Sequence, residues 1–194
     1  MKTLPINVNL AGMPVLIIGG GPLAAEKLDK LLRYDANVTV VSPELCDDVR
    51  RLADARRIRF IEDVYRPTYL PGYRLVMAAT GNRKVHEQIH SDTRGRCCLL
   101  NAVDTPDLCD FILPAVVQGE HFSLAISTGG KAAGLARHLR EELEQTLHRE
   151  DDILELLEAI RTLFKRKYTS FDERRRRLMA ILDELDAIER AESA

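Results

Sequence analysis

The sequence contains no tryptophan, only 5 tyrosines and 5 phenylalanines among 194 residues, and no apolar run near the roughly 20 residues that span a bilayer. Its amino terminus, MKTLPINVNL, lacks the apolar stretch and the small-residue cleavage site of a signal peptide. It also lacks an excess of either charge, with 28 basic and 30 acidic residues, which disfavours nucleic acid as a partner. These absences predict a globular, cytoplasmic protein that contacts neither a membrane nor nucleic acid.

Cysteine is scarce as well. The four cysteines form no CxxC pair and fall short of the density of a disulfide scaffold; they are Cys46, Cys97, Cys98 and Cys109. Because Cys97-Cys98 opens an apolar run, we interpret the four as reduced thiols, with a metal or redox role as the alternative. His86 and His90 have the i, i+4 spacing of paired metal ligands, but no third ligand is obvious. We therefore predict two helix-surface histidines and no metal site.

The first hundred residues alternate short apolar runs with longer amphipathic stretches, which is the pattern of βαβ units. The apolar runs predict strands at residues 15–18, 38–41, 57–61, 75–79 and 97–103. The stretches between them predict helices at residues 23–34 and 83–94. Ser42-Pro43 predicts a further helix start, with Ser42 as its N-cap. This part of the chain is therefore predicted to be an α/β fold with a Rossmann-type parallel sheet.

A different pattern begins near Pro114. Residues 115–117 and 122–126 flank a Gln118-Gly119-Glu120-His121 turn and predict an antiparallel hairpin. A helix is predicted from Lys131 to about His148, and the chain from Asp152 on is predicted helical, with a new start at the capping box of Ser170 and Glu173. We predict a Rossmann domain at residues 1–113, a small α+β domain at 114–150 and a helical C-terminal domain at 151–194.

A glycine-rich motif, Gly19-Gly20-Gly21-Pro22-Leu23-Ala24, lies between the first predicted strand and helix and fits the pattern G-x-G-x-x-A. Glycine lets the backbone turn tightly and approach a pyrophosphate, a small sixth residue lets the helix pack closely, and the helix N-terminal amides face the anion. We predict that residues 19–23 bind a dinucleotide. A tight glycine turn without a ligand is the alternative.

The expected cofactor is NAD rather than NADP. The second predicted strand ends at Ser42-Pro43, where an Asp or Glu commonly holds the ribose hydroxyls, so Ser42, Pro43, Glu44 or backbone groups must do so here. No basic residue stands at this strand end to meet a 2′-phosphate.

A carboxylate follows the last predicted strand of this domain, in Asn101-Ala102-Val103-Asp104-Thr105-Pro106. Open α/β sheets bind their ligands at this edge, so Asp104 is a candidate general base. A turn or N-cap aspartate before Pro106 is the alternative.

Several segments, in their order and spacing, resemble the precorrin-2 dehydrogenase/sirohydrochlorin ferrochelatase family. They are Leu4-Pro5-Ile6, Gly19-Gly20-Gly21, Ala78-Ala79-Thr80, Asn101 to Asp104, Phe111-Ile112-Leu113-Pro114, Ser127 to Gly130, Leu135-Ala136-Arg137 with Leu139-Arg140, and Glu173-Arg174-Arg175-Arg176. The resemblance covers nearly the whole chain. It departs at Thr128, where some relatives have serine, and at residues 131–134, where many carry a hydroxyl residue and a proline.

The resemblance implies NAD-dependent oxidation of precorrin-2 to sirohydrochlorin by a homodimer. Residues 114–150 would be its dimerisation domain, with elements exchanged between the two copies. Some relatives are fused to the methyltransferase that makes precorrin-2, and here we expect another protein to do that step. Relatives also differ in whether they insert Fe²⁺, as a substrate, into sirohydrochlorin, and the sequence leaves this second activity open.

The resemblance also implies roles for individual residues. Asp104 would be the catalytic base, and Thr80 and Asn101 would join the cofactor site. Because the tetrapyrrole substrate is a polycarboxylate, Arg137 and Arg140 would bind its side chains, with solvated surface arginines as the alternative.

The loop that follows the predicted hairpin would assist these arginines. It could open a helix N-terminus towards the same carboxylates, with a plain hairpin exit as the alternative; its residues are Ser127, Thr128, Gly129 and Gly130.

A function of another class also fits a Rossmann domain: sensing of NAD for a partner, without turnover. Such a sensor would need neither Asp104 nor the Ser127 loop.

Overall fold

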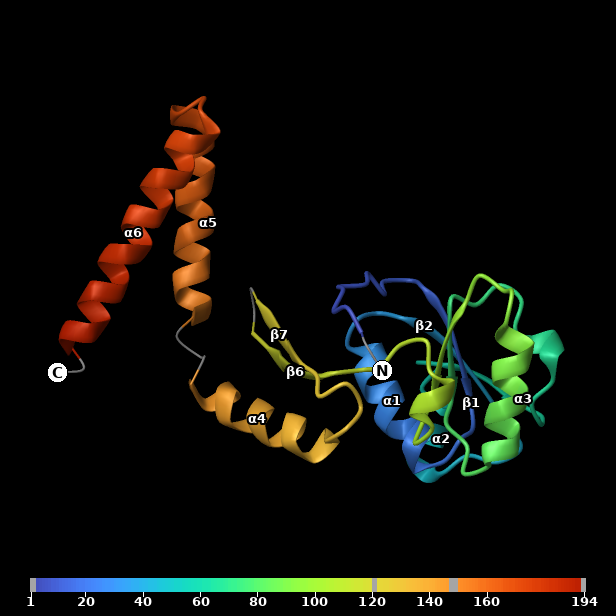
Figure 1. The fold of residues 1–194 in the computed structure, drawn as a ribbon. Coiled ribbons are helices and arrows are strands. Elements are labelled where there is room, and N and C mark those ends of the chain that lie inside the picture. Colours follow the sequence, from blue (N-terminus) through green and yellow to red (C-terminus); the bar gives the residue numbers. More distant parts are fainter. Residues whose placement is uncertain (1–2, 120–121, 147–149, 193–194) are drawn as a thin grey trace. The chain divides into compact units, whose positions relative to one another are not determined.

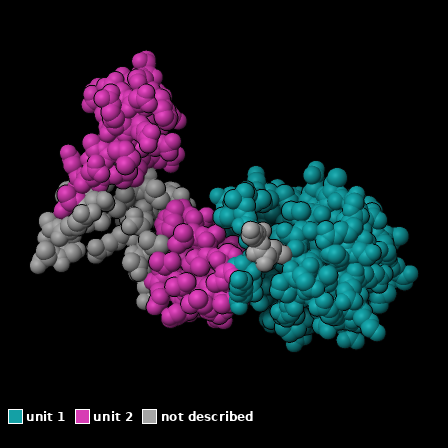
Figure 2. Space-filling view, viewed as in Figure 1, with its two compact units in different colours: residues 1–113, 129–131 teal, residues 114–128, 132–194 magenta. Residues whose placement is uncertain are grey.

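The computed structural model describes residues 3–119, 122–146 and 150–192. The chain divides into two compact units, residues 1–113 with 129–131 and residues 114–128 with 132–194 (Figure 2). The predicted further boundary at residue 150 stays a prediction. Glu120 and His121 of the predicted turn, and His148 at the predicted helix end, lie outside the described residues.

The first unit is a parallel sheet with helices on both faces (Figure 1). Its five strands lie in the order β3-β2-β1-β4-β5; they are β1 (Pro14–Ile18), β2 (Asn37–Ser42), β3 (Arg59–Glu62), β4 (Leu75–Ala78) and β5 (Leu99–Ala102). The connections contain α1 (Pro22–Leu32), α2 (Asp47–Asp54) and α3 (Arg83–Thr93), with short 3-10 turns η1 (Pro67–Tyr69) and η2 (Pro106–Leu108). The predicted α/β class with a Rossmann-type sheet is confirmed. Because the strands are parallel, all five end at one edge, and the strand order reverses between β1 and β4.

The central strands are apolar on both sides because both faces of the sheet are covered. Val15 and Ile17 of β1 pack with Leu28 of α1 on one face. Leu16 of the same strand packs with Ile89 of α3 on the other face. The continuous apolar run of β1 is therefore completely buried, and the strand holds the turn that follows it in a defined place.

The predicted helix start at Pro43 is wrong. Ser42 is the last residue of β2, and α2 begins five residues later, at Asp47, with Cys46 as its N-cap. The Ser42 hydroxyl donates to the Glu44 carbonyl at 2.7 Å, so it stabilises the loop instead of capping a helix. The loop is tied to the glycine motif, because the Cys46 N–H donates to the Gly20 carbonyl at 2.8 Å. This tertiary contact overrides the local capping signal.

The second unit begins with the predicted antiparallel hairpin, formed by β6 (Ala115–Gln118) and β7 (Ser123–Ile126), in which Ala115 pairs with Ile126. The helix α4 (Ala133–Thr146) packs on this hairpin, and α5 (Glu150–Lys167) packs against α6 (Phe171–Glu192). The Ser170 hydroxyl accepts from the Glu173 N–H at 3.4 Å, which forms one half of the predicted capping box. Within the described ranges, no helix has the combined length and apolar character to cross a bilayer.

Candidate functional site

The loops after β1, β4 and β5 are each hydrogen-bonded to the end of a neighbouring strand at the carboxyl edge of the sheet. The Gly19 N–H donates to the Val41 carbonyl at 2.9 Å, and the Ala79 N–H donates to the Ile18 carbonyl at 2.8 Å. The Val103 N–H donates to the Ala78 carbonyl at 2.9 Å. The ladder therefore continues just past the strand ends, and it brings the glycine turn, Thr80 and the Asp104 turn to one edge.

The three glycines of the motif have different surroundings. Gly19 has φ +113°, and a Cβ there would lie 2.4 Å from the Ala79 carbonyl oxygen. A Cβ at Gly20 would lie 2.3 Å from the Glu44 carbonyl oxygen. A Cβ at Gly21 would meet nothing within 4 Å. Gly19 and Gly20 are thus required by packing inside the protein, whereas Gly21 faces open space.

The open space at Gly21 adjoins the N-terminus of α1. Gly21 is the N-cap and provides no side-chain hydrogen bond to the helix, and Pro22 stands in the first turn without an N–H. The first-turn amides of Leu23 and Ala24 are therefore the donors for an anion, and the helix dipole adds to the attraction. Ala24 is completely buried, as its small size requires for close packing on the sheet. These residues fit the pyrophosphate of a dinucleotide.

The end of β2 offers one exposed carboxylate for a ribose. Ser42 is 6% exposed, and its hydroxyl is already bonded to the Glu44 carbonyl. Pro43 and Glu44 are exposed. Glu44 thus stands two residues beyond the position where the acidic residue of this fold commonly lies.

Thr80 and Asn101 use their side chains within the protein. The Thr80 hydroxyl accepts from the Asn82 N–H at 3.3 Å, which shapes the turn after β4. Asn101 is 8% exposed, and its amide donates to the Phe111 carbonyl at 2.9 Å, which fastens β5 to the segment that follows η2. Thr80 lies two residues past the end of β4 and Asn101 is the next-to-last residue of β5, so both lie near the carboxyl edge of the sheet.

Asp104 stands in a turn with φ 59°, the left-handed region that is uncommon outside glycine. Its side chain is exposed, and within the described residues its carboxylate makes no hydrogen bond. The neighbouring Thr105 N–H donates to the Ala102 carbonyl at 3.2 Å and closes the turn. A carboxylate in this position is free to take a proton from a bound ligand.

The substrate residues expected from the resemblance are divided between the two units: Gly129 and Gly130 belong to the first, and Ser127, Thr128 and the two arginines belong to the second. The Thr128 hydroxyl accepts from the Ala132 N–H at 3.1 Å just before α4. Gly129 and Gly130 have φ 64° and 81°, so two successive left-handed residues turn the chain there. Ser127 is exposed.

The two arginines of α4 are paired with glutamates one turn further along the helix. The Arg137 Nε donates to Glu141 at 3.0 Å, and Arg140 donates to both carboxylate oxygens of Glu144 at 2.5 and 2.6 Å. An exposed i, i+4 pair such as Arg137–Glu141 contributes a few tenths of a kcal/mol, roughly 0.3–0.5, so another carboxylate could replace the glutamate there at small cost. Arg140 is only 27% exposed and also bonds to Glu141 at 3.1 Å, so it is held more firmly.

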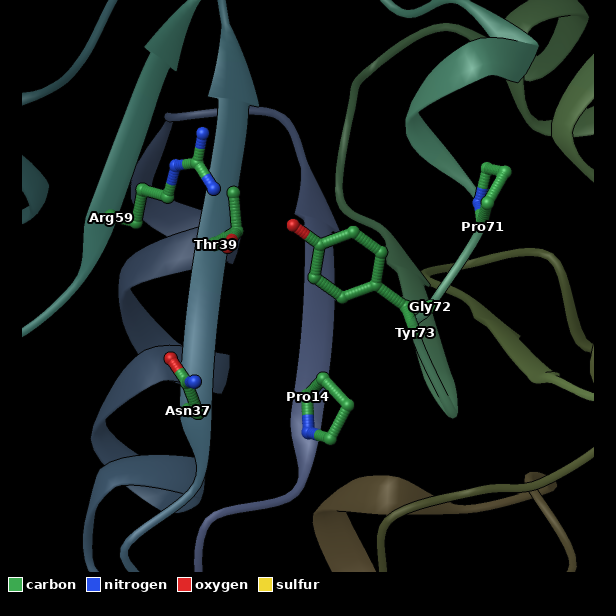
Figure 3. Close-up of a pocket in the computed structure, with 7 residues that line it drawn as sticks. All are labelled: Pro14, Asn37, Thr39, Arg59, Pro71, Gly72 and Tyr73. Atoms are coloured by element: carbon green, nitrogen blue, oxygen red, sulfur yellow. The ribbon is translucent and has the colours of Figure 1, made fainter.

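A separate cavity of about 230 Å³ lies at the opposite edge of the sheet, where the strands begin (Figure 3). It is lined by Pro14, Asn37, Thr39, Arg59, Pro71, Gly72 and Tyr73. None of the predicted site residues belongs to it, so it is distinct from the carboxyl edge.

A family model for NAD(P)-binding domains matches residues 6–115, which is more than half of the chain and includes the glycine turn and Asp104. The chain belongs to this NAD(P)-binding family. Its cofactor is therefore a nicotinamide dinucleotide, in agreement with the glycine turn and the uncapped α1.

Curated relatives of this NAD(P)-binding chain bear the name siroheme synthase. That of Photorhabdus laumondii is 42% identical over 147 residues, which are 76% of this chain and 31% of the relative. That of Pseudoalteromonas atlantica is 34% identical over 184 residues, 94% of this chain and 40% of the relative. The matched region thus spans 31% to 40% of the length of these relatives. The resemblance seen in the sequence is confirmed.

Among solved structures, SirC, a precorrin-2 dehydrogenase, has a TM-score of 0.74 and 23% sequence identity, over 94% of this chain and 90% of that one. This similarity shows that the two proteins share a fold across both units.

The burial of His86 differs from the prediction made from the sequence. The residue was predicted on a helix surface, but it is 3% exposed. The imidazole turns inward because His86 shares one face of α3 with Ile89 and Thr93, which are also buried. That spacing of three and four residues is the signal that could have placed it. The searched, described residues contain no group of three or more His, Cys, Asp or Glu that could hold a metal ion.

Proposed function

We propose that the chain oxidises precorrin-2 to sirohydrochlorin, with NAD⁺ as the hydride acceptor. The observation that carries this proposal is the Asp104 carboxylate, exposed in a left-handed turn on the same sheet edge as the dinucleotide-binding glycine turn. The siroheme synthases and the precorrin-2 dehydrogenase described above support the choice of substrate.

NAD is the proposed form of the cofactor. Glu44 would accept hydrogen bonds from the ribose hydroxyls, and its negative charge would repel a 2′-phosphate. Leu23, Ala24 and the open backbone at Gly21 would hold the pyrophosphate. The strand ends at Thr80 and Asn101 would border the nicotinamide half.

The reaction removes one hydride and one proton from precorrin-2. When bound, NAD⁺ would supply the acceptor for the hydride. Asp104 accepts the proton, and a positioned base typically contributes ~10²–10⁴-fold to the rate. Asp104 can do this because its carboxylate is exposed and makes no hydrogen bond to the described residues.

The second unit would bind the carboxylates of the tetrapyrrole. Arg137 and Arg140 would exchange their glutamate partners for substrate carboxylates through charge-assisted hydrogen bonds. The Ser127, Thr128, Gly129 and Gly130 loop would add donors before α4. We further propose a homodimer in the cytoplasm, with residues 114–150 as the dimerising part.

The test uses Asp104→Asn, which keeps the size and local turn preference of the side chain but removes its basicity. Formation of NADH is followed by its absorbance, with purified protein, precorrin-2 and NAD⁺. We expect wild-type turnover, a loss of at least about 100-fold in Asp104→Asn, and unchanged NAD⁺ affinity. Absence of NADH formation by the wild type, or an unaltered rate in the variant, would contradict the proposal.

The same experiment separates the enzyme from an NAD sensor, which would bind NAD⁺ and show no turnover in either form. A second assay mixes sirohydrochlorin with Fe²⁺ as a substrate and follows the absorbance of the macrocycle. It determines whether metal insertion accompanies the oxidation.

A further inference from the structure

A buried histidine lies behind the Asp104 turn. His86, in the first turns of α3, is 3% exposed, and Thr105, the residue after Asp104, is 4% exposed. The His86 Nδ1 and the Thr105 Oγ1 are 2.8 Å apart. Burial lowers the pKa of the His86 imidazole and the positive charge of Arg83 lowers it too, while the Thr80 backbone and the Asp104 carboxylate raise it. The imidazole is therefore neutral near pH 7.

The direction of this hydrogen bond follows from the partners of Thr105. The Thr105 hydroxyl is 3.0 Å from the Val103 carbonyl, which can only accept, so the hydroxyl donates its single proton there. With the hydroxyl proton assigned to Val103, Thr105 accepts from His86, and the proton of the neutral ring is assigned to Nδ1. Nε2 is left as a bare acceptor, and among the described residues it has no hydrogen-bond partner. The buried Nε2 loses its hydration without gaining a hydrogen bond, which is an energetic cost of the arrangement in which Nδ1 donates to Thr105.

The bond fixes the turn that carries Asp104. The Thr105 side chain bonds to Val103 and His86, its N–H donates to the Ala102 carbonyl at 3.2 Å, and its carbonyl accepts from the Leu108 N–H at 3.0 Å. Asp104 lies between these anchors with φ 59°. A non-glycine residue in this region is disfavoured and persists only where its surroundings hold it.

We infer that His86 is a positioning residue, whose Nδ1–H bond to Thr105 holds the left-handed turn in which Asp104 presents its carboxylate to the substrate. The inference rests on the proposed function for the role of Asp104. His86 does not act as the base itself, because its free Nε2 is buried and the ring cannot touch a ligand.

Two pairs of variants separate the hydrogen bond from mere packing. His86→Asn places an amide N–H near the position of Nδ1, whereas His86→Gln places it near Nε2 and loses the bond to Thr105. Thr105→Ser keeps the hydroxyl, whereas Thr105→Val keeps the shape and removes it. We expect kcat for precorrin-2 to fall roughly 10- to 100-fold in His86→Gln and Thr105→Val, as for a misplaced catalytic group. His86→Asn and Thr105→Ser should retain most of kcat, and KM for NAD⁺ should not change in any of the four.

If His86 acts through Asp104, the effects are not additive. In an Asp104→Asn background, His86→Gln should lower the residual rate by less than about twofold. A full additional loss would show that His86 works independently of Asp104 and would overturn the inference.

A readout without substrate keeps this inference separate from the proposed function. The ¹⁵N spectrum of the imidazole should show the neutral Nδ1–H tautomer, and the backbone coupling and Cα shift of Asp104 should report a left-handed φ. We expect the Nδ1–H tautomer in the two proteins that keep both the ring and the hydroxyl, wild type and Thr105→Ser. We expect the left-handed Asp104 in wild type, His86→Asn and Thr105→Ser, and its loss in folded His86→Gln and Thr105→Val. A left-handed Asp104 in all five proteins, or an Nε2–H tautomer in the wild type, overturns the inference. Failure of turnover with the expected spectra would instead count against the proposed reaction alone.

Discussion

Two alanine substitutions in the glycine turn, Gly19→Ala and Gly21→Ala, separate the stability of the fold from cofactor binding. In Gly19→Ala the new Cβ would lie 2.4 Å from the Ala79 carbonyl oxygen, and the residue would keep φ +113°. In Gly21→Ala the Cβ meets nothing within 4 Å, and φ is −87°, which alanine adopts freely. The first change is therefore expected to damage the fold, and the second to occupy the space in which the pyrophosphate would lie.

The magnitudes follow from these two environments. The disfavoured φ of Gly19→Ala costs about 1–3 kcal/mol, and overlap with a strand carbonyl adds about 1–3 kcal/mol. At roughly 2–4 °C per kcal/mol for a chain of this size, the midpoint of thermal unfolding should fall by roughly 5–20 °C. For Gly21→Ala, the weaker N-cap is offset by the reduced entropy of the unfolded chain, so its free energy of unfolding should stay within about 1 kcal/mol.

Circular dichroism against temperature measures stability, and titration calorimetry with NAD⁺ measures affinity. We expect Gly21→Ala to unfold like the wild type and to bind NAD⁺ at least about tenfold more weakly, which is about 1.4 kcal/mol. Two results would refute this reasoning: a Gly21→Ala protein that binds NAD⁺ normally, or a Gly19→Ala protein that is as stable as the wild type.

Two further predictions concern pH and thiol chemistry. Burial lowers the pKa of His86 in the folded protein, so the unfolded chain binds the proton at a higher pH than the folded one does. The free energy of unfolding should therefore fall as the pH drops below about 6.5. Denaturant titrations should show a smaller fall in His86→Asn. Hydrogen bonds from Tyr69 and Arg66 lower the pKa of Asp63 to about 2, so its contribution is lost only between about pH 4 and 2 and does not overlap that of His86. A thiol reagent followed by mass spectrometry should label the exposed Cys97 well before Cys109. Burial raises the pKa of the Cys109 thiol, and its Sγ lies 3.2 Å from both the N and the O atom of Ala102. Equal labelling rates in the folded protein would contradict this prediction.

Local patterns predicted the elements whose signal lies within a few residues. The buried run of β1 and the glycine motif after it were placed correctly, because a strand buried on both faces needs apolar residues throughout. The hairpin of β6 and β7 was placed correctly, since turn residues between two short apolar runs are its whole signal. The Ser42 cap failed because the same residues that could start a helix form a loop against Gly20, a contact between segments more than 20 residues apart.

The sequence by itself determined which residues are apolar, at which period they recur and where glycine permits a turn. Those properties are enough for the α/β class and for a glycine turn that predicts a dinucleotide site, whereas the catalytic role predicted for Asp104 rests on the family resemblance. Only the tertiary structure decided what each side chain meets. The sheet order brings the ends of β1, β4 and β5 to one edge, and α3 turns His86 inward onto Thr105. The physical reason is that a hydrogen bond requires a distance of about 3 Å between its two groups. Groups that lie far apart in the sequence reach that distance only in the folded protein.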